Sequence, residues 1–365
     1  MRLETDALGE MEIPDDAYYG IQTTRTAANY AVSPHTYGEY MEIVRAVAEV
    51  KKACAMTNEE IGALDPRKSR AIQQAADEVI AGKFDGQFPV NVWRSQGTGV
   101  NMNVNEVIGN RANEILTGKK GREEIHPNTH VNMCQSSNDV FPTAENIVIY
   151  KGIGLVSDSL RHLEETLGGK AFEFRDTVRL GRTGLQDAVP MTWGQVFGGW
   201  QSEIQRARKA LEAYRPVFQG VVLGGTVLGT GMGQQPGYSE RIYGNLSRVL
   251  GYDVHPVAME REVIPDSALF DGMRNTDHHA SLMDLLKAAA TAMGRIANDL
   301  MIFSSGPSAG IRELFLPEVA RGRSGIRAKP RPGCRRWCSK PRRRWSAQPS
   351  WRSSRRTRGS RTTGP

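Results

Sequence analysis

Three polar segments of the chain carry residue types that could bind a small anion. They span residues 96–106, 126–139 and 181–190, combine hydroxyl and amide side chains with glycine, and each leads into a long helical pattern. Helix N-termini expose unpaired N–H groups and a positive partial charge, so they suit carboxylate or phosphate ligands. The same residue types also form caps and turns, so each segment taken singly favours capping. None of the segments matches a phosphate-binding loop, a dinucleotide fingerprint or a nucleophile elbow.

Long stretches of helical periodicity separate these segments. The longest, almost free of internal proline, are 143–175, 193–215 and 280–303. Asp65 followed by Pro66 predicts a helix start, and Gly118 predicts a helix end. Helices of ~20 residues are ~30 Å long, so several of them side by side favour a bundle. We therefore predict a mostly α chain with a small mixed N-terminal domain (1–137), an incomplete long-helix bundle (138–319) and a disordered tail (320–365).

The basic character of the chain is confined to its end. Of its 47 Lys and Arg, 16 lie in residues 321–365, which hold no Asp or Glu, so residues 1–320 carry 31 against 40 acidic residues. An acidic body argues against nucleic-acid binding outside the tail. Residues 321–365 hold only eight Ala, Ile, Cys or Trp. Such a composition cannot offset roughly 1–2 kcal/mol of backbone entropy per residue, which is why we predict disorder there.

The cysteines and the hydropathy exclude several classes of protein. Cys54 and Cys134 stand alone, and the pair Cys334 and Cys338 has no matching pair downstream. The sequence therefore predicts neither a disulfide framework nor a metal site. The N-terminus lacks an apolar signal core, and no stretch approaches the ~18 apolar residues that span a bilayer. We expect a cytoplasmic protein without membrane contact.

In their order and spacing, the polar segments resemble the class II fumarase/aspartase superfamily. The matching runs are Gly-Thr-x-x-Asn-Met-Asn-x-Asn-Glu from Gly97, Gln-Ser-Ser-Asn-Asp-x-Phe-Pro-Thr ending at Thr143, and Gly-Arg-Thr-x-Leu-Gln-Asp-Ala from Gly181. Similar runs at 223–231 and 297–307 extend the resemblance over about residues 3–319. Within the superfamily the chain looks most like an aspartate ammonia-lyase, on the strength of residues 16–20, 128–132 and 186–190. A fumarate hydratase is the alternative.

The resemblance implies elimination across the Cα–Cβ bond of a succinate skeleton, from L-aspartate to fumarate and ammonia, without a metal or organic cofactor. Such a reaction requires a positioned base and stabilisation of the aci-carboxylate that forms. By motif position, the residues that would hold the substrate are Thr98, Ser136, Ser137, Asn138 and Thr183. Family sites are assembled from three subunits, so the expected partners are a small dicarboxylate and further copies of the chain in a homotetramer.

The segment that should supply the base departs from the family pattern. The family has Gly-Ser-Ser-x-Met-Pro-x-Lys-x-Asn with the base at the first Ser, whereas this chain has Arg323 at that position. Ser324 and Lys329 match the second Ser and the Lys, so Ser324 is the remaining candidate base and Lys329 a candidate substrate ligand. Gly184 also stands where the family commonly has His or Gln, which can hydrogen-bond the substrate, and Ser308 stands where the family usually has Arg. We therefore predict impaired activity.

Three interpretations of the C-terminal residues stay open. A frame-shifted translation of the family C-terminus would explain the Arg, Trp and Pro enrichment of 321–365. A selected arm for nucleic acid would also interleave Trp with Arg, although the acidic body gives it no support. A folded but catalytically dead subunit, joined to intact homologues in an oligomer, is the third.

Overall fold

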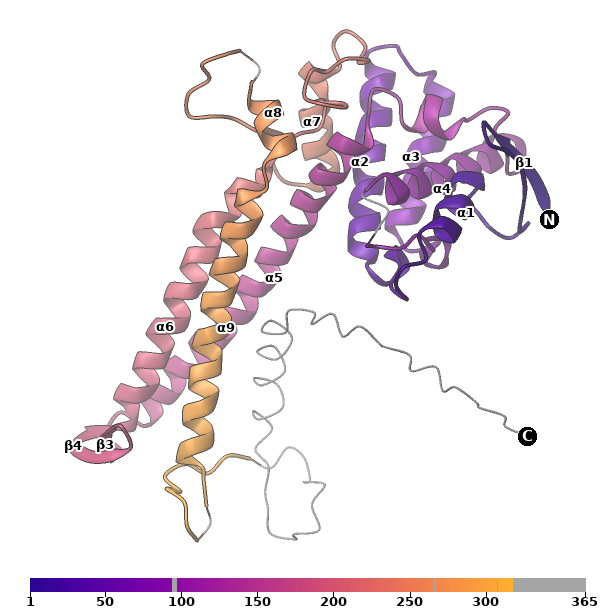
Figure 1. Cartoon of the computed structure of the whole chain (residues 1–365). Coiled ribbons are helices and arrows are strands. Elements are labelled where there is room, and N and C mark those ends of the chain that lie inside the picture. The colour runs from indigo at the N-terminus through magenta and orange to yellow at the C-terminus, as the bar shows by residue number, and fades with distance from the viewer. Residues whose placement is uncertain (94–96, 266, 307, 318–365) are drawn as a thin grey trace, which may run out of the picture. The chain divides into compact units, whose positions relative to one another are not determined.

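A computed structural model describes the chain over residues 1–93, 97–265, 267–306 and 308–317 (Figure 1). These residues are mostly α-helical, with long helices and little sheet, which confirms the predicted fold class. None of the helices within these ranges has the length and apolar character needed to cross a membrane. The predicted tail, 320–365, lies outside the described residues.

The chain forms two compact units. The first joins Met1–Asp158 with Leu211–Ser281, and the second joins Ser159–Ala210 with the described residues from Leu282 onward. The chain therefore enters the second unit twice. The domain boundary expected at residue 137 stays a prediction.

The first unit combines short strands with packed helices. The strands β1 (Arg2–Asp6) and β2 (Gly9–Ile13) pair antiparallel. Its early helices are α1 (Ile21–Asn29), α2 (Met41–Glu60), α3 (Pro66–Ile80), α4 (Thr98–Thr117) and the first turns of α5 (Ser137–Glu173). A π-helical turn (Pro127–Val131) precedes α5. Its later elements are β5 (Gly220–Val221), α7 (Ser239–Leu250), β6 (His255–Pro256), α8 (Ser267–Arg274) and the start of α9 (Asp277–Phe303).

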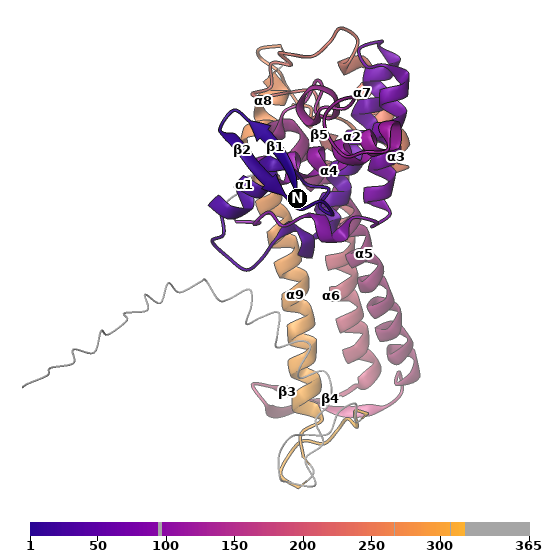
Figure 2. The same cartoon turned by 90° about the vertical axis from the view of Figure 1, so that its right-hand side faces the viewer.

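Helix α2 lies in the core of the first unit. It packs against α3 and α7, and α3 packs in turn against α4 (Figures 1 and 2). Val47, Val50 and Cys54 on α2 are fully buried, because they recur on one face at helical spacing. Lys51 is fully buried as well. A buried lysine needs hydrogen-bond partners, and these lie in the candidate site described below.

Local signals set two helix ends as predicted. The Asp65 side chain accepts hydrogen bonds from the backbone N–H groups of Arg67 and Lys68, with Pro66 at the first helical position of α3. Gly118 adopts φ 77° and ends α4, a left-handed conformation that glycine adopts without steric cost. Both predictions are confirmed.

The second unit contains long helices lying side by side. They are the later turns of α5, most of α6 (Trp193–Tyr214) and most of α9 (Figures 1 and 2). Their bounds confirm the three long stretches of helical periodicity to within a few residues. Arg208 Nε donates to Glu164 Oε2 at 2.8 Å between α6 and α5, and Arg295 Nη1 lies 3.4 Å from Glu203 Oε1 between α9 and α6.

A hairpin follows α5 where the sequence indicated only a polar turn segment. The strands β3 (Val178–Thr183) and β4 (Gln186–Thr192) pair antiparallel. Gly184 and Leu185 between them both adopt positive φ, 54° and 65°, which is the geometry of a tight two-residue hairpin turn. The sequence offered no alternation of apolar and polar residues here because most of β4 is exposed on both faces.

A buried arginine fastens the last described segment to this hairpin. The guanidinium carbon of Arg179 lies 4.1 Å from the ring centroids of both Trp193 and Phe303. Its Nη2 lies 3.2 Å from Glu313 Oε2, and Arg182 also pairs with Glu313. The carboxylate thus ties the segment after α9 to β3.

Candidate active site at the starts of helices α4 and α5

The first candidate binding residue, Thr98, opens helix α4. Gly97 before it adopts φ 76°. A Cβ at this glycine would lie 2.7 Å from Cγ of the Phe141 ring, which belongs to the second turn of α5. Position 97 therefore requires glycine for two reasons, the positive φ of the backbone and the short distance to the Phe141 ring. This contact brings the exposed Thr98 to the same place as the start of α5.

Buried Asp139 shapes the start of α5. One carboxylate oxygen accepts the backbone N–H of Ser136 at 2.8 Å, and the other accepts those of Gly224 and Thr226 at 3.0 Å each. Burial raises the pKa of Asp139 to about 6, against the opposing effect of these N–H donors and of Lys51. The carboxylate thus holds the glycine-rich segment after β5 against α5. Its oxygens are directed at the backbone, so we assign it a structural role.

The candidate residues Ser136, Ser137 and Asn138 stand at this helix start. The first two are half-buried and Asn138 is exposed. The Asn138 amide donates to the Val227 carbonyl at 2.9 Å, and the Asn138 backbone N–H donates to Ser136 Oγ at 3.2 Å. Hydroxyl and amide donors at a helix N-terminus suit a carboxylate because they need no particular protonation state.

A polar network below this surface was not predicted from the sequence. The Lys51 ammonium donates to Asn132 Oδ1 at 2.8 Å and to Gln135 Oε1 at 2.7 Å. Asn101 donates from its amide to Asn132 Oδ1 at 3.2 Å and to Ser137 Oγ at 3.0 Å. Burial lowers the pKa of Lys51 to about 7, although Cys54 and Asp139 oppose this. The available signal was a lysine on the apolar stripe of α2, four residues after Val47 and three before Cys54.

Part of the middle polar segment is accounted for by capping. His126 Nδ1 accepts the backbone N–H groups of Asn128 at 3.2 Å and Thr129 at 3.3 Å, at the start of the π-helical turn. Burial lowers the pKa of both His126 and His130. Capping of the π-helical turn is therefore enough to explain the presence of these residues in the segment.

The remaining predicted site residues lie outside the described part of the first unit. Thr183 is exposed at the end of β3, in the second unit. Ser324 and Lys329 lie outside the described residues. No cluster of three or more His, Cys, Asp or Glu side chains suited to a metal ion occurs in the described part of the chain.

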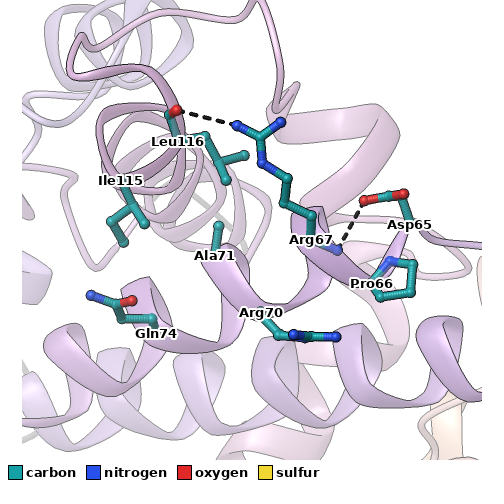
Figure 3. Close-up of a pocket in the computed structure, with 8 residues that line it drawn as sticks. All are labelled: Asp65, Pro66, Arg67, Arg70, Ala71, Gln74, Ile115 and Leu116. Atoms are coloured by element: carbon teal, nitrogen blue, oxygen red, sulfur yellow. Dashed lines mark hydrogen bonds between the residues drawn. The ribbon is translucent and has the colours of Figure 1, made fainter.

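A separate surface pocket lies at the start of α3 (Figure 3). Its lining comprises Asp65, Pro66, Arg67, Arg70, Ala71, Gln74, Ile115 and Leu116. Asp65 is occupied in capping, and Arg67 Nη2 donates to the Leu116 carbonyl at 3.4 Å. The pocket contains none of the residues that carry the family motifs, so it is distinct from the candidate active site.

Comparison with known proteins decides the family. A family model described as "Lyase" matches residues 9–329. The chain belongs to this lyase family. It is 40% identical to the class II fumarate hydratase of Thermosynechococcus vestitus over 91% of this chain and 69% of that protein. It is 38% identical, over the same shares, to the aspartate ammonia-lyase of a Bacillus species. Membership of the fumarase/aspartase superfamily is thus confirmed.

Solved structures of lyases support the same fold. The fumarate lyase:delta crystallin protein from Brucella melitensis, bound to cobalt, aligns with a TM-score of 0.87 and 37% identity, covering 93% of this chain and 73% of that one. The class II fumarase from Schistosoma mansoni aligns with a TM-score of 0.85 and 33% identity, over 93% and 74% of the two chains. The chain spans 64% of the length of the Danio rerio mitochondrial fumarate hydratase, to which it is 39% identical.

Proposed function

We propose that this chain binds a four-carbon dicarboxylate and serves the reversible addition of water to fumarate. The binding proposal rests on one observation, the close packing of the starts of α4 and α5. Gly97 lies against the Phe141 side chain, and the Asn101 amide donates a hydrogen bond to Ser137 Oγ. The starts of the two helices, with their hydroxyl and amide side chains, therefore lie close together. Each charge-assisted hydrogen bond to a carboxylate contributes about 1.5–3 kcal/mol.

In this proposal the substrate carboxylates are held by Thr98, Ser136, Ser137 and Asn138. Thr183 and Lys329 complete the binding set by family motif, and Ser324 is the candidate base. Because family sites combine segments of several subunits, we propose that a homotetramer assembles the site. Arg323 at the family's base position cannot accept a proton, so we expect turnover far below that of an intact relative.

Hydration replaces ammonia elimination as our main proposal. Similar curated proteins are mostly named fumarate hydratase. Ammonia elimination from aspartate is the second candidate. It is supported by the similarity to the aspartate ammonia-lyase of a Bacillus species and by the aspartase-like runs at 128–132 and 186–190. The donors at α4 and α5 recognise carboxylates, which malate and aspartate share, so they do not choose between the two reactions.

The proposal can be tested by supplying the purified 365-residue chain with malate or with aspartate in separate assays. In each assay the formation of fumarate is followed by its absorbance. We expect slow fumarate formation from malate, abolished in Ser137→Ala and retained in Ser247→Ala, a serine of α7 outside the candidate site. Turnover with aspartate alone would replace hydration by ammonia elimination. Calorimetric titration with fumarate separates binding from chemistry, and absence of any dicarboxylate binding would refute the proposal.

A further inference from the structure

The ammonium of Lys51 is a fully buried charge near the candidate site. Its side chain is fully buried on α2, and both of its hydrogen bonds given above reach the segment that precedes α5. Asn132 and Gln135, the two acceptors, lie just before the proposed substrate-binding residues. Taking an ammonium out of water is costly unless it is well paired. A lysine placed here therefore needs a reason beyond packing.

The hydrogen bonds of Lys51 provide such a reason, because they fix which groups of the network donate and which accept. An ammonium can only donate, so Asn132 must present its amide oxygen toward Lys51. That oxygen also receives the amide N–H groups of Asn101 and Asn105, each at 3.2 Å. Asn101 must therefore turn its NH₂ group toward this place, and its second hydrogen reaches Ser137 Oγ at 3.0 Å. Because the Ser137 oxygen accepts this hydrogen bond from Asn101, the hydroxyl hydrogen of Ser137 is left to donate to another acceptor.

The opposite orientation would reverse the role of Ser137. The Asn132 orientation is also supported by its own Nδ2, which donates to the Gln135 backbone carbonyl at 3.2 Å. Lys51 adds a donor whose role cannot reverse. Without that donor, an Asn132 amide that breaks its bond to the Gln135 carbonyl can rotate and present its NH₂ group to Asn101. The Asn101 amide would then rotate too, and its oxygen, which is buried without a hydrogen-bond partner in the structure, would become an acceptor. Ser137 would donate inward to Asn101 and present only lone pairs to a ligand. Lone pairs repel a carboxylate, whereas a hydroxyl hydrogen binds it.

From this geometry we propose that Lys51 is a positioning residue, which holds the 132–137 segment in place and fixes Ser137 as a hydrogen-bond donor toward a substrate carboxylate. The inference rests on the proposed dicarboxylate binding. It goes beyond the family motifs because, among the described residues, the Lys51 ammonium bonds to Asn132 and Gln135 rather than to a proposed substrate-binding residue, and so acts through Asn132 and Asn101.

The neighbouring lysine provides a matched control. Lys52 follows directly on α2, but its ammonium pairs with Asp77 on α3, at 2.7 Å from Oδ1. Lys51→Met and Lys52→Met both replace a lysine by an unbranched apolar side chain of similar length, and only the first removes the donor to Asn132 and Gln135. If Lys51→Met fails to fold, Lys51→Gln replaces it in the experiment. A glutamine amide can either donate or accept, so it does not fix the orientation of the Asn132 side-chain amide.

The first measurement needs no ligand. Hydrogen–deuterium exchange on the full-length protein follows peptides covering 132–138, where the backbone N–H of Ser136 bonds to Asp139 and that of Gln135 to the Asn132 carbonyl. We expect exchange there to rise on the order of 10-fold in Lys51→Met, and to stay unchanged in Lys52→Met. Unchanged exchange in folded Lys51→Met, or in Lys51→Gln in its place, would overturn the positioning role whether or not any ligand binds.

The second measurement uses succinate, an unreactive dicarboxylate, in calorimetric titration. We expect Lys51→Met to weaken succinate binding about 10-fold or more, as Ser137→Ala does, with Lys52→Met unaffected. In the Ser137→Ala background, the further loss on Lys51→Met should be under about 2-fold, since both changes remove the same donor. Independent, additive losses would refute the relay. If the unmodified protein binds no succinate, the proposed function fails, and the exchange experiment still decides the role of Lys51.

Discussion

Replacing Gly97 by alanine tests the junction that joins the starts of α4 and α5. The residue adopts φ 76°, and an added Cβ would lie 2.7, 2.8 and 3.0 Å from three atoms of the Phe141 side chain. A non-glycine residue at positive φ costs on the order of 1 kcal/mol. Overpacking against a ring held in a core typically adds about 1–3 kcal/mol. We therefore expect Gly97→Ala to lower the free energy of unfolding by about 2–4 kcal/mol.

Gly118 isolates the packing contribution. It has nearly the same conformation, φ 77°, but nothing lies within 4 Å of a Cβ added there. Gly118→Ala should therefore cost only the backbone part, about 1 kcal/mol. Urea unfolding followed by far-ultraviolet circular dichroism measures both variants. Equal losses of stability in the two would refute the argument that Phe141 requires glycine at position 97. Gly97→Ala should also weaken dicarboxylate binding, because it displaces Thr98, whereas Gly118→Ala should not.

Two further predictions concern charges that are half-buried or fully buried. Glu313→Gln removes the carboxylate that pairs with Arg179 and Arg182, and should destabilise the protein by about 1–3 kcal/mol in thermal unfolding; an unchanged midpoint would contradict the clamp. Asp139, which Lys51 faces from α2, has its pKa raised from 3.8 to about 6, chiefly by burial. Its contribution to stability is therefore fully present below about pH 4 and lost as the pH rises through about 6, on the order of 3 kcal/mol. The difference in unfolding free energy between the unmodified protein and Asp139→Asn should fall accordingly between pH 4 and pH 7, and a constant difference would show that the carboxyl is not perturbed.

The sequence by itself determined the features that depend on neighbouring residues. Asp65 with Pro66 starts a helix, and Gly118 ends one, because caps are local hydrogen-bond and φ preferences. Apolar periodicity located the long helices for the same reason. The motifs at the starts of α4 and α5 identified the superfamily without any structure. The hairpin after α5 was not predicted, since its second strand, β4, is mostly exposed and carries no alternating pattern.

Only the tertiary structure decided which groups meet. Lys51 on α2, Asn101 on α4 and Ser137 on α5 are up to 86 positions apart in the sequence, and no local preference relates them. Their hydrogen bonds arise because α2, α4 and α5 bury their faces against one core. A lysine on an apolar stripe indicates that something must pair with it, but the partner is fixed by packing. The sequence thus predicts which hydroxyls would bind a carboxylate, and in our proposal the packed core sets the direction in which the Ser137 hydroxyl donates.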